Sequence, residues 1–243
     1  MLMMHRYPIE HAAIRSFQDL LWKDMPDSQM PTDFYSDEAR DVMRLSSKNH
    51  VDVPIEVDGA TLHVLASHPT PPSFDGPEDR NGRRNHDEIR LWNDYISGGD
   101  QASYLVDNDG TTGGLGDDAT FVLLGDLNSD PEDGDSRRSA LNDLLAHART
   151  DDPAPTSAGA EQAGEDDGGV NPDHSGARAL DTADFSDHQV GNLRVDYALP
   201  SSNLEVLDSS VFWPVSGAEG AALADVSDHH LVYVDVQIDV SAE

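Results

Sequence analysis

The sequence predicts a mixed α/β (α+β) domain, because strand-like and helix-like patterns alternate along the chain. The strongest strand signals are a hairpin over residues 51–66 and the apolar run Phe121–Leu124. A helical pattern lies between them, where apolar residues recur on one face over residues 89–96. A chain of 243 residues can form one large domain or two small ones. The regular strand signals, with no long linker between them, predict a single domain over residues 1–243.

Residues 5–24 fit two kinds of element. Ile14, Phe17 and Leu21 follow helical spacing, yet the preceding Tyr7–Ile9 looks extended. The pattern therefore leaves this segment open between a helix and an extended chain.

A hairpin is the clearest element in the sequence. Apolar side chains alternate with polar ones over residues 51–57 and again over residues 62–66. Asp58 and Gly59 lie between the two runs, and Asp-Gly is a preferred two-residue turn between antiparallel strands. We therefore predict two paired strands, the second ending at His68.

A proline-rich loop after Pro69 leads into a helix whose start carries several arginines. Arg83 and Arg84, with Arg80 just before them, form one of the few basic clusters in the chain. A guanidinium group can bind a phosphate through two hydrogen bonds, so Arg83 and Arg84 are candidate substrate-binding residues. The alternative is that these arginines neutralise nearby carboxylates of the same segment.

The run Phe121–Leu124 and the polar turn after it are central to the functional hypothesis. The run is typical of a buried strand that ends at Gly125. If the chain stays extended, Asp126 and Asn128 point the same way, because strand side chains alternate with a period of two. A carboxylate can orient a nucleophile or hold a cation, and a carboxamide can donate to an anionic oxygen. The same residues are ordinary turn formers, so a purely structural turn is the alternative.

The rest of the chain continues the alternation of helix and strand. Residues 136–149 predict a helix that Ser136 would cap. Residues 150–183 are dominated by Ala, Gly, Asp and Pro, which predicts a flexible acidic surface insertion. Strand patterns resume at Arg194 and end with the alternating run over residues 231–240.

Charge is the most unusual feature of the composition. The chain has 47 acidic residues against 15 Lys and Arg, a formal net charge of −32. Such a chain repels itself in dilute solution, whereas molar salt shortens the Debye length to about 3 Å and screens the repulsion. We therefore expect a halophilic protein, since the strand patterns are too regular for a disordered acidic chain. A long nucleic acid would also be repelled, unless a local basic groove or high salt compensated.

The composition excludes several classes of protein. The chain has no Cys, so disulfides and thiolate metal sites are excluded. No apolar run is long enough to predict a membrane span. Met1–Met4 lacks the apolar core of a signal peptide. No obligate protein partner is indicated, and the cellular compartment is left open.

Polar residues stand at the ends of three predicted strands, namely His68, Asp126 with Asn128, and Asp228 with His229. A rigid sheet can present such residues to one cleft. An Asp beside a His fixes the ring tautomer and raises the pKa of the ring, and an imidazolium can bind or protonate a phosphate oxygen. The alternative is a purely structural Asp–His pair. The Ser-Asp-His tripeptide occurs again at residues 186–188, but no alternating strand follows it directly. We therefore interpret that repeat as a coincidence.

The order of these sites and the residues around them resemble the motifs of the endonuclease/exonuclease/phosphatase superfamily. This superfamily includes pancreatic-type deoxyribonucleases, inositol-phosphate phosphatases and sphingomyelinases. The matching stretches are ASHPTPP around His68, GDLN with Asp126 and Asn128, RVDYAL around Asp196, and SDHH at Asp228 and His229. Together they span roughly residues 45–238. On this resemblance Asp196 joins the candidate substrate-binding residues.

The resemblance implies a four-layer αββα sandwich, two sheets flanked by helices, with a divalent cation, Mg²⁺ or Mn²⁺, at the sheet edges. Asp126 would orient the attacking water and, with Asp228, bind the cation. Asn128 would hold the phosphate. His229, backed by Asp228, would contact the phosphoryl oxygens and act as acid or base, with His68 on the same cleft. The substrate would be a phosphate ester, with nucleic acid among the candidates.

Members of the superfamily begin with a strand that carries an Asn, followed later by a Glu that is the main metal ligand. Nothing before His5 matches that strand, so we expect a domain that is N-terminally incomplete. Together with the acidic composition, the resemblance predicts a haloarchaeal-type member. The leading hypothesis is a metal-dependent phosphoesterase, either a phosphodiesterase or nuclease or a phosphatase. The alternative is a non-catalytic remnant or binding module that keeps the fold without those metal ligands.

Overall fold

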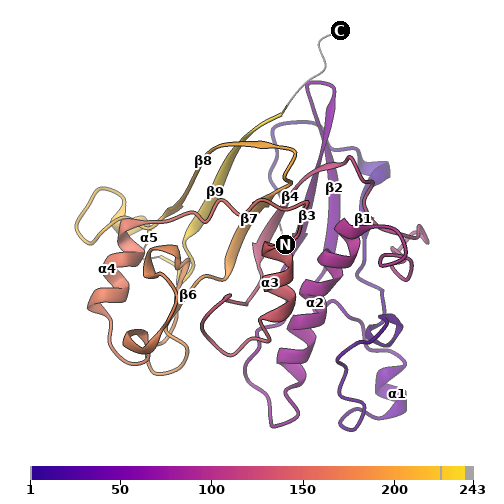
Figure 1. Cartoon of the computed structure of the whole chain (residues 1–243), viewed down its shortest axis with the longest axis horizontal. Coiled ribbons are helices and arrows are strands. Elements are labelled where there is room, and N and C mark those ends of the chain that lie inside the picture. The colour runs from indigo at the N-terminus through magenta and orange to yellow at the C-terminus, as the bar shows by residue number, and fades with distance from the viewer. Residues whose placement is uncertain (1, 225, 239–243) are drawn as a thin grey trace.

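The structure, a computed structural model, describes residues 2–224 and 226–238. Its centre is a five-stranded mixed sheet in the order β1-β2-β3-β4-β7, with helices α2 and α3 against one face (Figure 1). The strands of this sheet are β1 (Arg15–Ser16), β2 (His50–Val57), β3 (Ala60–Ser67), β4 (Thr120–Asp126) and β7 (Asp196–Pro200). The mixed α/β class expected from the sequence is confirmed.

The N-terminal segment takes the extended alternative. Residues 5–24 contain β1 and two short 3-10 helices, η1 (His11–Ala13) and η2 (Trp22–Asp24). Phe17 and Trp22 are fully buried, because the extended segment lies along the edge of β2 and turns inward. One further turn of helix, α1 (Asp37–Arg40), follows in the loop.

The hairpin of β2 and β3 forms as predicted. Val53 lies opposite Val64 in antiparallel register. Asp58 and Gly59 both have positive φ, at 49° and 89°. Two consecutive positive φ angles define the turn that best matches the twist of antiparallel strands, which is why Asp-Gly is favoured there.

Strand β3 continues through helix α2 (Arg80–Ser97) into β4, which pairs with β3 in parallel. Ile89, Trp92 and Ile96 are fully buried on the predicted apolar face of α2. Because the two strands are parallel, their carboxyl ends reach the same edge of the sheet. His68 follows β3 and Asp126 ends β4, so this edge carries both residues.

Helix α3 (Ser139–Leu145) packs beside α2. It begins two residues later than a helix capped by Ser136 would, and its N-cap is Arg138. The Ser136 hydroxyl instead accepts a hydrogen bond from the Ser129 hydroxyl at 2.8 Å.

The segment for which we expected a flexible insertion contains regular structure. Ser157 caps the start of helix α4 (Ala158–Asp166), because its side chain accepts a hydrogen bond from the Ala160 amide at 3.1 Å. It is followed by η3 (Asn171–Asp173), η4 (Arg178–Leu180) and β5 (Ala183–Asp184), and β5 pairs with β6 (Asn192–Leu193). Ala183, Leu193 and Val195 form a small second core under this lobe.

A second sheet pairs β8 (Glu205–Phe212) with β9 (Leu231–Gln237), and β9 contacts β7. Between them lies the short helix α5 (Ala221–Ala224). Side chains of β9 alternate between half-buried and exposed, as the sequence predicted. The last two residues of the predicted run, 239 and 240, lie outside the described residues.

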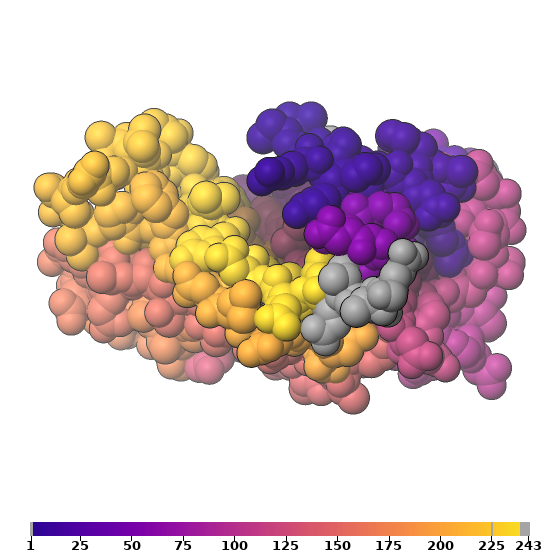
Figure 2. Space-filling view, turned by 90° about the horizontal axis from the view of Figure 1, so that it is seen from above, coloured from indigo at the N-terminus to yellow at the C-terminus, as the bar shows by residue number. Residues whose placement is uncertain are grey.

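Seen from above, a notch separates the N-terminal residues, in indigo, from the lobe in orange to yellow that belongs to the later part of the chain (Figure 2). Of the helices described, none is both long and apolar enough to cross a membrane.

Two buried polar residues of α2 hold the loops that carry the sheet-edge residues. The Asn85 side chain donates to the carbonyl oxygens of Thr70 and Leu127, both at 2.9 Å. One turn further on, the Glu88 carboxylate accepts from the amides of Ser47 and Thr70, both at 2.6 Å. Neither α2 side chain is exposed to solvent. The loop after β3 and the loop after β4 are therefore tied to one helix.

Replacing Asn85 tests this tie. Asn85→Ala leaves buried carbonyl oxygens without a donor, so we expect the free energy of unfolding to fall by about 1–3 kcal/mol. Urea denaturation measures the loss, and Asn142→Ala on the exposed side of α3 is the matched control, with an expected change within about 0.5 kcal/mol. Equal losses in the two variants would contradict the proposed tie.

Candidate active site

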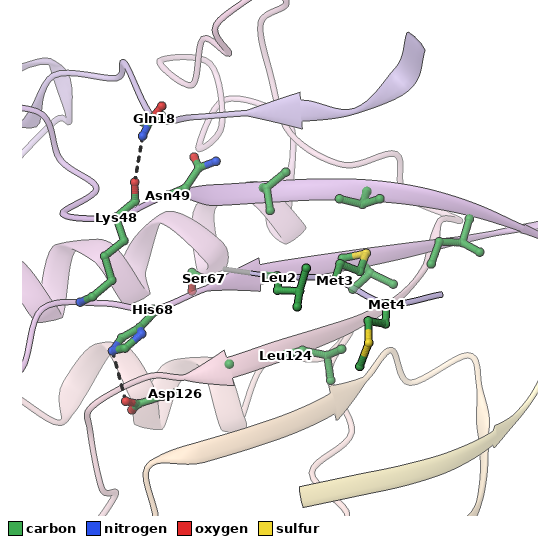
Figure 3. A pocket seen from close by; sticks show the side chains of 16 residues that line it. Leu2, Met3, Met4, Gln18, Lys48, Asn49, Ser67, His68, Leu124 and Asp126 are labelled. Atoms are coloured by element: carbon green, nitrogen blue, oxygen red, sulfur yellow. Dashed lines mark hydrogen bonds and ion pairs between the residues drawn. The ribbon is translucent and has the colours of Figure 1, made fainter. Parts of the chain in front are cut away.

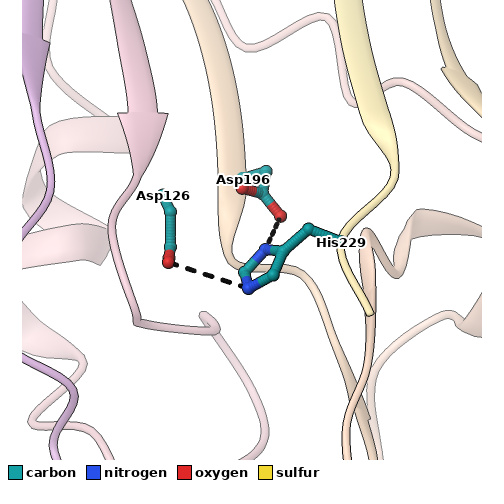
Figure 4. A group of neighbouring side chains, drawn as sticks. All are labelled: Asp126, Asp196 and His229. Carbon is teal, nitrogen blue, oxygen red and sulfur yellow. Dashed lines mark hydrogen bonds and ion pairs between the residues drawn. The ribbon is translucent and has the colours of Figure 1, made fainter. Parts of the chain in front are cut away.

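Four side chains from four segments meet at the carboxyl edge of β3 and β4, namely His68, Asp126, Asp196 and His229. Figure 4 shows three of them, with the His229 ring between the two carboxylates. Asp126 and Asp196 are register partners in the antiparallel pair of β4 and β7, which places them side by side. His229 lies just before β9, and its backbone pairs with Ala183.

The end of β4 shows both the predicted turn and the predicted pairing. The Asn128 amide donates to Asp126 Oδ1 at 2.7 Å, and its side chain donates to Asp126 Oδ2 at 3.1 Å. Asn128 has a φ of 50°, so the chain turns there rather than staying extended. Strand β4 runs one residue past Gly125, which has a φ of 152°. A Cβ atom at this position would collide with the Ser67 carbonyl oxygen. Only glycine permits this close approach to β3.

His68 faces Asp126 from the neighbouring strand end. Its Nε2 lies 3.3 Å from Asp126 Oδ2 (Figure 3). Burial, together with the charges of Lys48 and His229, lowers the pKa of His68. The ring is therefore neutral at neutral pH.

His229 forms its strongest contact with Asp196. Its Nδ1 lies 2.8 Å from Asp196 Oδ2, and its Nε2 faces Asp126 at 3.9 Å. The hydrogen bond that the ring donates to Asp196 raises the pKa of His229 to about 9, against the opposing effect of burial. The ring is therefore an imidazolium at neutral pH, and its Nε2 carries a proton toward Asp126.

The sequence predicts Asp228 as the carboxylate behind His229 and as a metal ligand, but the structure places another carboxylate behind the ring. Asp228 is exposed, and the ring contacts Asp196 instead. The reason is topological: Asp228 adjoins His229 in the chain, but β7 brings the Asp196 side chain to the ring from the neighbouring strand. Asp228 remains on the wall of the adjoining cavity.

Thr182 positions Asp196, a role that the sequence does not reveal. Its fully buried hydroxyl donates to Asp196 Oδ2 at 3.0 Å and accepts from the amides of Val195 and Asp196. Its carbonyl accepts from the His230 amide at 2.8 Å, beside His229. A lone Thr in a segment rich in small and acidic residues gives no pattern that would reveal this role. Asn85 and Glu88 were detectable, because they stand one turn before Ile89 and Trp92 on the apolar face of α2.

The two carboxylates favour a positively charged ligand. Burial raises the pKa of Asp126 to about 6, and the nearby Asp196 adds to this effect. Ligand atoms of Asp126, Asp196 and His229 all lie within 4.8 Å of one another. With both carboxylates ionised and His229 protonated, this group carries a net negative charge. Two such oxygens at one edge fit Mg²⁺ or Mn²⁺, and water molecules supply the remaining ligands of such ions in many proteins.

Two cavities meet at His68 and Asp126. A cavity of about 800 Å³ lies over the apolar face of β2, β3 and β4, where Leu2, Met3 and Met4 also lie (Figure 3). The other, of about 410 Å³, extends past Asn128 and His229 toward Phe74 and Phe185. The Phe185 ring meets the His229 ring edge-on at 5.3 Å. His68, Asp126 and His229 are thus reachable from these cavities, whereas Asp196 lines neither of them and is only partly exposed.

The predicted arginines are not brought to this group. Arg83 donates to the carbonyl oxygens of Glu78 and Gln29. Arg84 donates to those of Leu45 and Arg44, and its guanidinium lies 6.0 Å from the centroid of the Trp22 ring. Neither residue lines either of the two cavities. Both brace loops against the start of α2, and substrate binding by them stays a prediction.

Several solved structures are similar to this chain. The endonuclease/exonuclease/phosphatase from Beutenbergia cavernae DSM 12333 is similar with a TM-score of 0.52 and 15% identity, over 96% of this chain and 46% of that one. A family protein from Leptotrichia buccalis C-1013-b gives 0.41 and 18%, over 81% and 56%. The beta toxin of Staphylococcus aureus gives 0.41 and 13%, over 81% and 59%. The chain thus spans about half the length of these structures.

The Beutenbergia structure shows a shared fold at this level of identity. A search of curated proteins finds no match. A model of the Endonuclease/Exonuclease/phosphatase family matches residues 1–229, which include all four converging side chains. This chain therefore belongs to the Endonuclease/Exonuclease/phosphatase family.

Proposed function

We propose that this chain hydrolyses a phosphate ester by in-line attack of water, assisted by a divalent cation. The observation that carries the proposal is the convergence of two carboxylates and two imidazoles at one sheet edge. His68 lies 3.3 Å from Asp126, and His229 lies 2.8 Å from Asp196. Membership of the family supports phosphate-ester chemistry in general.

Each side chain has a role that its protonation state permits. Asp126 and Asp196 would hold Mg²⁺ or Mn²⁺, and such a cation stabilises negative charge on phosphoryl oxygens. His229 would donate its Nε2 proton to a phosphoryl or leaving-group oxygen, because the ring is positively charged. His68, which is neutral, would accept the proton of the attacking water or orient it beside Asp126. Asn128 would donate from its carboxamide to the phosphate.

The cavity next to these residues favours a small substrate. Six aspartates line the 410 Å³ cavity, and none of its described lining residues is Lys or Arg. The six are Asp126, Asp130, Asp133, Asp135, Asp184 and Asp228. A long nucleic acid presents many phosphates, which need basic partners for affinity. We therefore propose a small phosphate monoester or diester rather than a polymer.

Hydrolysis should require the cation and the converging side chains. In molar KCl with Mg²⁺ or Mn²⁺, we expect cleavage of p-nitrophenyl phosphate or bis-p-nitrophenyl phosphate that EDTA abolishes. Asp126→Ala and His229→Ala should each lower kcat/KM about 100-fold or more, because they remove a cation ligand and a proton donor. Release of p-nitrophenol, followed by absorbance, gives the rates.

Asp135→Ala is the matched control for this assay. Asp135 lines the same cavity and carries the same charge, but it lies outside the converging group. We expect its rate to stay close to that of the unmodified chain. Equal activity in all four proteins would contradict the assignment, and an absence of both hydrolysis and Mg²⁺ binding would favour a non-catalytic binding module.

The protonation of His229 should depend on Asp196. The pKa of His229, raised to about 9 by Asp196, should fall toward its ordinary value near 6.5 in Asp196→Asn. In the unmodified chain, hydrolytic activity should fall as pH rises through about 9, because the His229 imidazolium loses its proton there. It should also fall as pH drops through about 6, where Asp126 gains a proton. NMR titration of the ring protons in the cation-free protein measures the pKa directly.

Asp228→Asn is the comparison for the NMR titration. It removes the same charge next to His229 in the chain, yet Asp228 is not the residue that hydrogen-bonds the ring. We expect only a small decrease in the pKa of His229. A larger decrease in Asp228→Asn than in Asp196→Asn would show that the sequence-based pairing of Asp228 with His229 was right after all.

A further inference from the structure

Phe74, in the loop after β3, has an aromatic side chain that is both exposed and held by a strained backbone. Its exposed fraction is 82%, against 49% for Phe34 and 41% for Phe212. Its φ is 65°, in the left-handed region that bulky residues rarely adopt. Because the ring is not buried, packing of the ring does not offset the cost of this conformation. Strain of this kind persists where it serves contact with a ligand.

The residues on both sides of Phe74 are fixed to the start of α2. The Asn81 side chain donates to the Ser73 carbonyl oxygen at 2.7 Å, and the Asn81 amide donates to Asp75 Oδ2 at 2.6 Å. The Phe74 carbonyl oxygen accepts from the Arg80 guanidinium at 3.4 Å. These hydrogen bonds hold the strained conformation in place and leave the ring free to contact a ligand.

Phe74 lines the cavity of about 410 Å³ beside the catalytic group, and Phe185 lines the same cavity. Phe185 packs against the small second core, and its ring meets the His229 ring edge-on at 5.3 Å. The loop after β3 thus supplies one aromatic ring and the loop after β5 supplies the other. Five more apolar side chains line this cavity, namely Pro71, Pro72, Val190, Leu193 and Val195. An apolar wall therefore begins next to the proposed proton donor.

The composition of the cavity limits what this wall can bind. The aspartates that line it disfavour a second phosphate, so the rest of the substrate carries no further negative charge. A cavity of this size holds a small organic group beside one phosphate. An aromatic ring suits the two Phe side chains, because stacked or edge-to-face ring pairs gain free energy beyond the area that they bury.

We propose that Phe74 and Phe185 bind an aromatic ring of the substrate, so that the preferred substrate is a small phosphate ester of an aromatic alcohol. The proposal rests on the proposed hydrolase function and adds a specificity determinant to it. The phosphate would lie beside His229, and the ring would extend along the cavity toward Phe74. Phe74 would contribute to binding and selectivity and take no part in proton transfer.

A pair of substrates that differ only in the ring tests the proposal. Benzyl phosphate and cyclohexylmethyl phosphate have similar size and similar leaving groups, but only the first has an aromatic ring. With each compound as the monoester and as its methyl diester, we expect kcat/KM to favour the benzyl compound about fivefold or more. Liquid chromatography of the released alcohol gives the rates.

Substitutions of Phe74 separate aromatic contact from apolar bulk. Phe74→Leu keeps an apolar side chain without a ring, so the preference for the benzyl compound should fall to about twofold or less, whereas Phe74→Tyr should retain it. Phe212→Leu is the matched control, because Phe212 is exposed and lines neither cavity. The melting temperature of Phe74→Leu should stay within about 2 °C of that of the unmodified chain, because the ring is exposed.

Binding of the corresponding phosphonates tests the ring contact without hydrolysis. In the presence of Mn²⁺, calorimetry should show tighter binding of benzylphosphonate than of cyclohexylmethylphosphonate, and Phe74→Leu should remove the difference. Hydrolysis or phosphonate binding without a preference for the ring, or an unchanged preference in Phe74→Leu, would overturn this proposal alone. A preference in binding without any hydrolysis would support the ring contact and contradict the proposed hydrolase function.

Discussion

Parallel pairing of β3 with β4 determines where the site forms. It brings the residues after both strands to one sheet edge, and the connecting helix α2 then holds both loops through Asn85 and Glu88. The antiparallel partner β7 adds Asp196 directly opposite Asp126. A site assembled in this way is positioned mainly by backbone pairing, and side-chain contacts only refine it.

The electrostatics of the site follow from its crowding. Burial and the neighbouring Asp196 raise the pKa of Asp126, and the hydrogen bond to Asp196 raises the pKa of His229. His68, close to Lys48 and His229, takes the opposite protonation state. Two imidazoles in different states within one cleft are suited to opposite steps of proton transfer.

Much of this arrangement could be predicted from the sequence, and the limits have physical causes. Local patterns revealed the hairpin, the buried face of α2, and the polar strand ends at His68, Asp126 and His229. The partner of His229 could not be predicted in this way, because Asp228 is nearer in the chain while Asp196 is nearer in space. The lobe of α4 was also missed, since its Ala- and Gly-rich sequence resembles a flexible loop, and the contacts that order it come from distant residues such as Trp213.

On the proposed function, separate strand ends surround one cation and one phosphorus atom. A crystal structure of the chain soaked with Mn²⁺, with anomalous scattering collected at the manganese edge, would locate the cation. We predict an anomalous peak in contact with both Asp126 and Asp196, with the His68 and His229 rings on its two sides. A peak remote from both carboxylates, or His68 and His229 directed into different solvent regions, would contradict it.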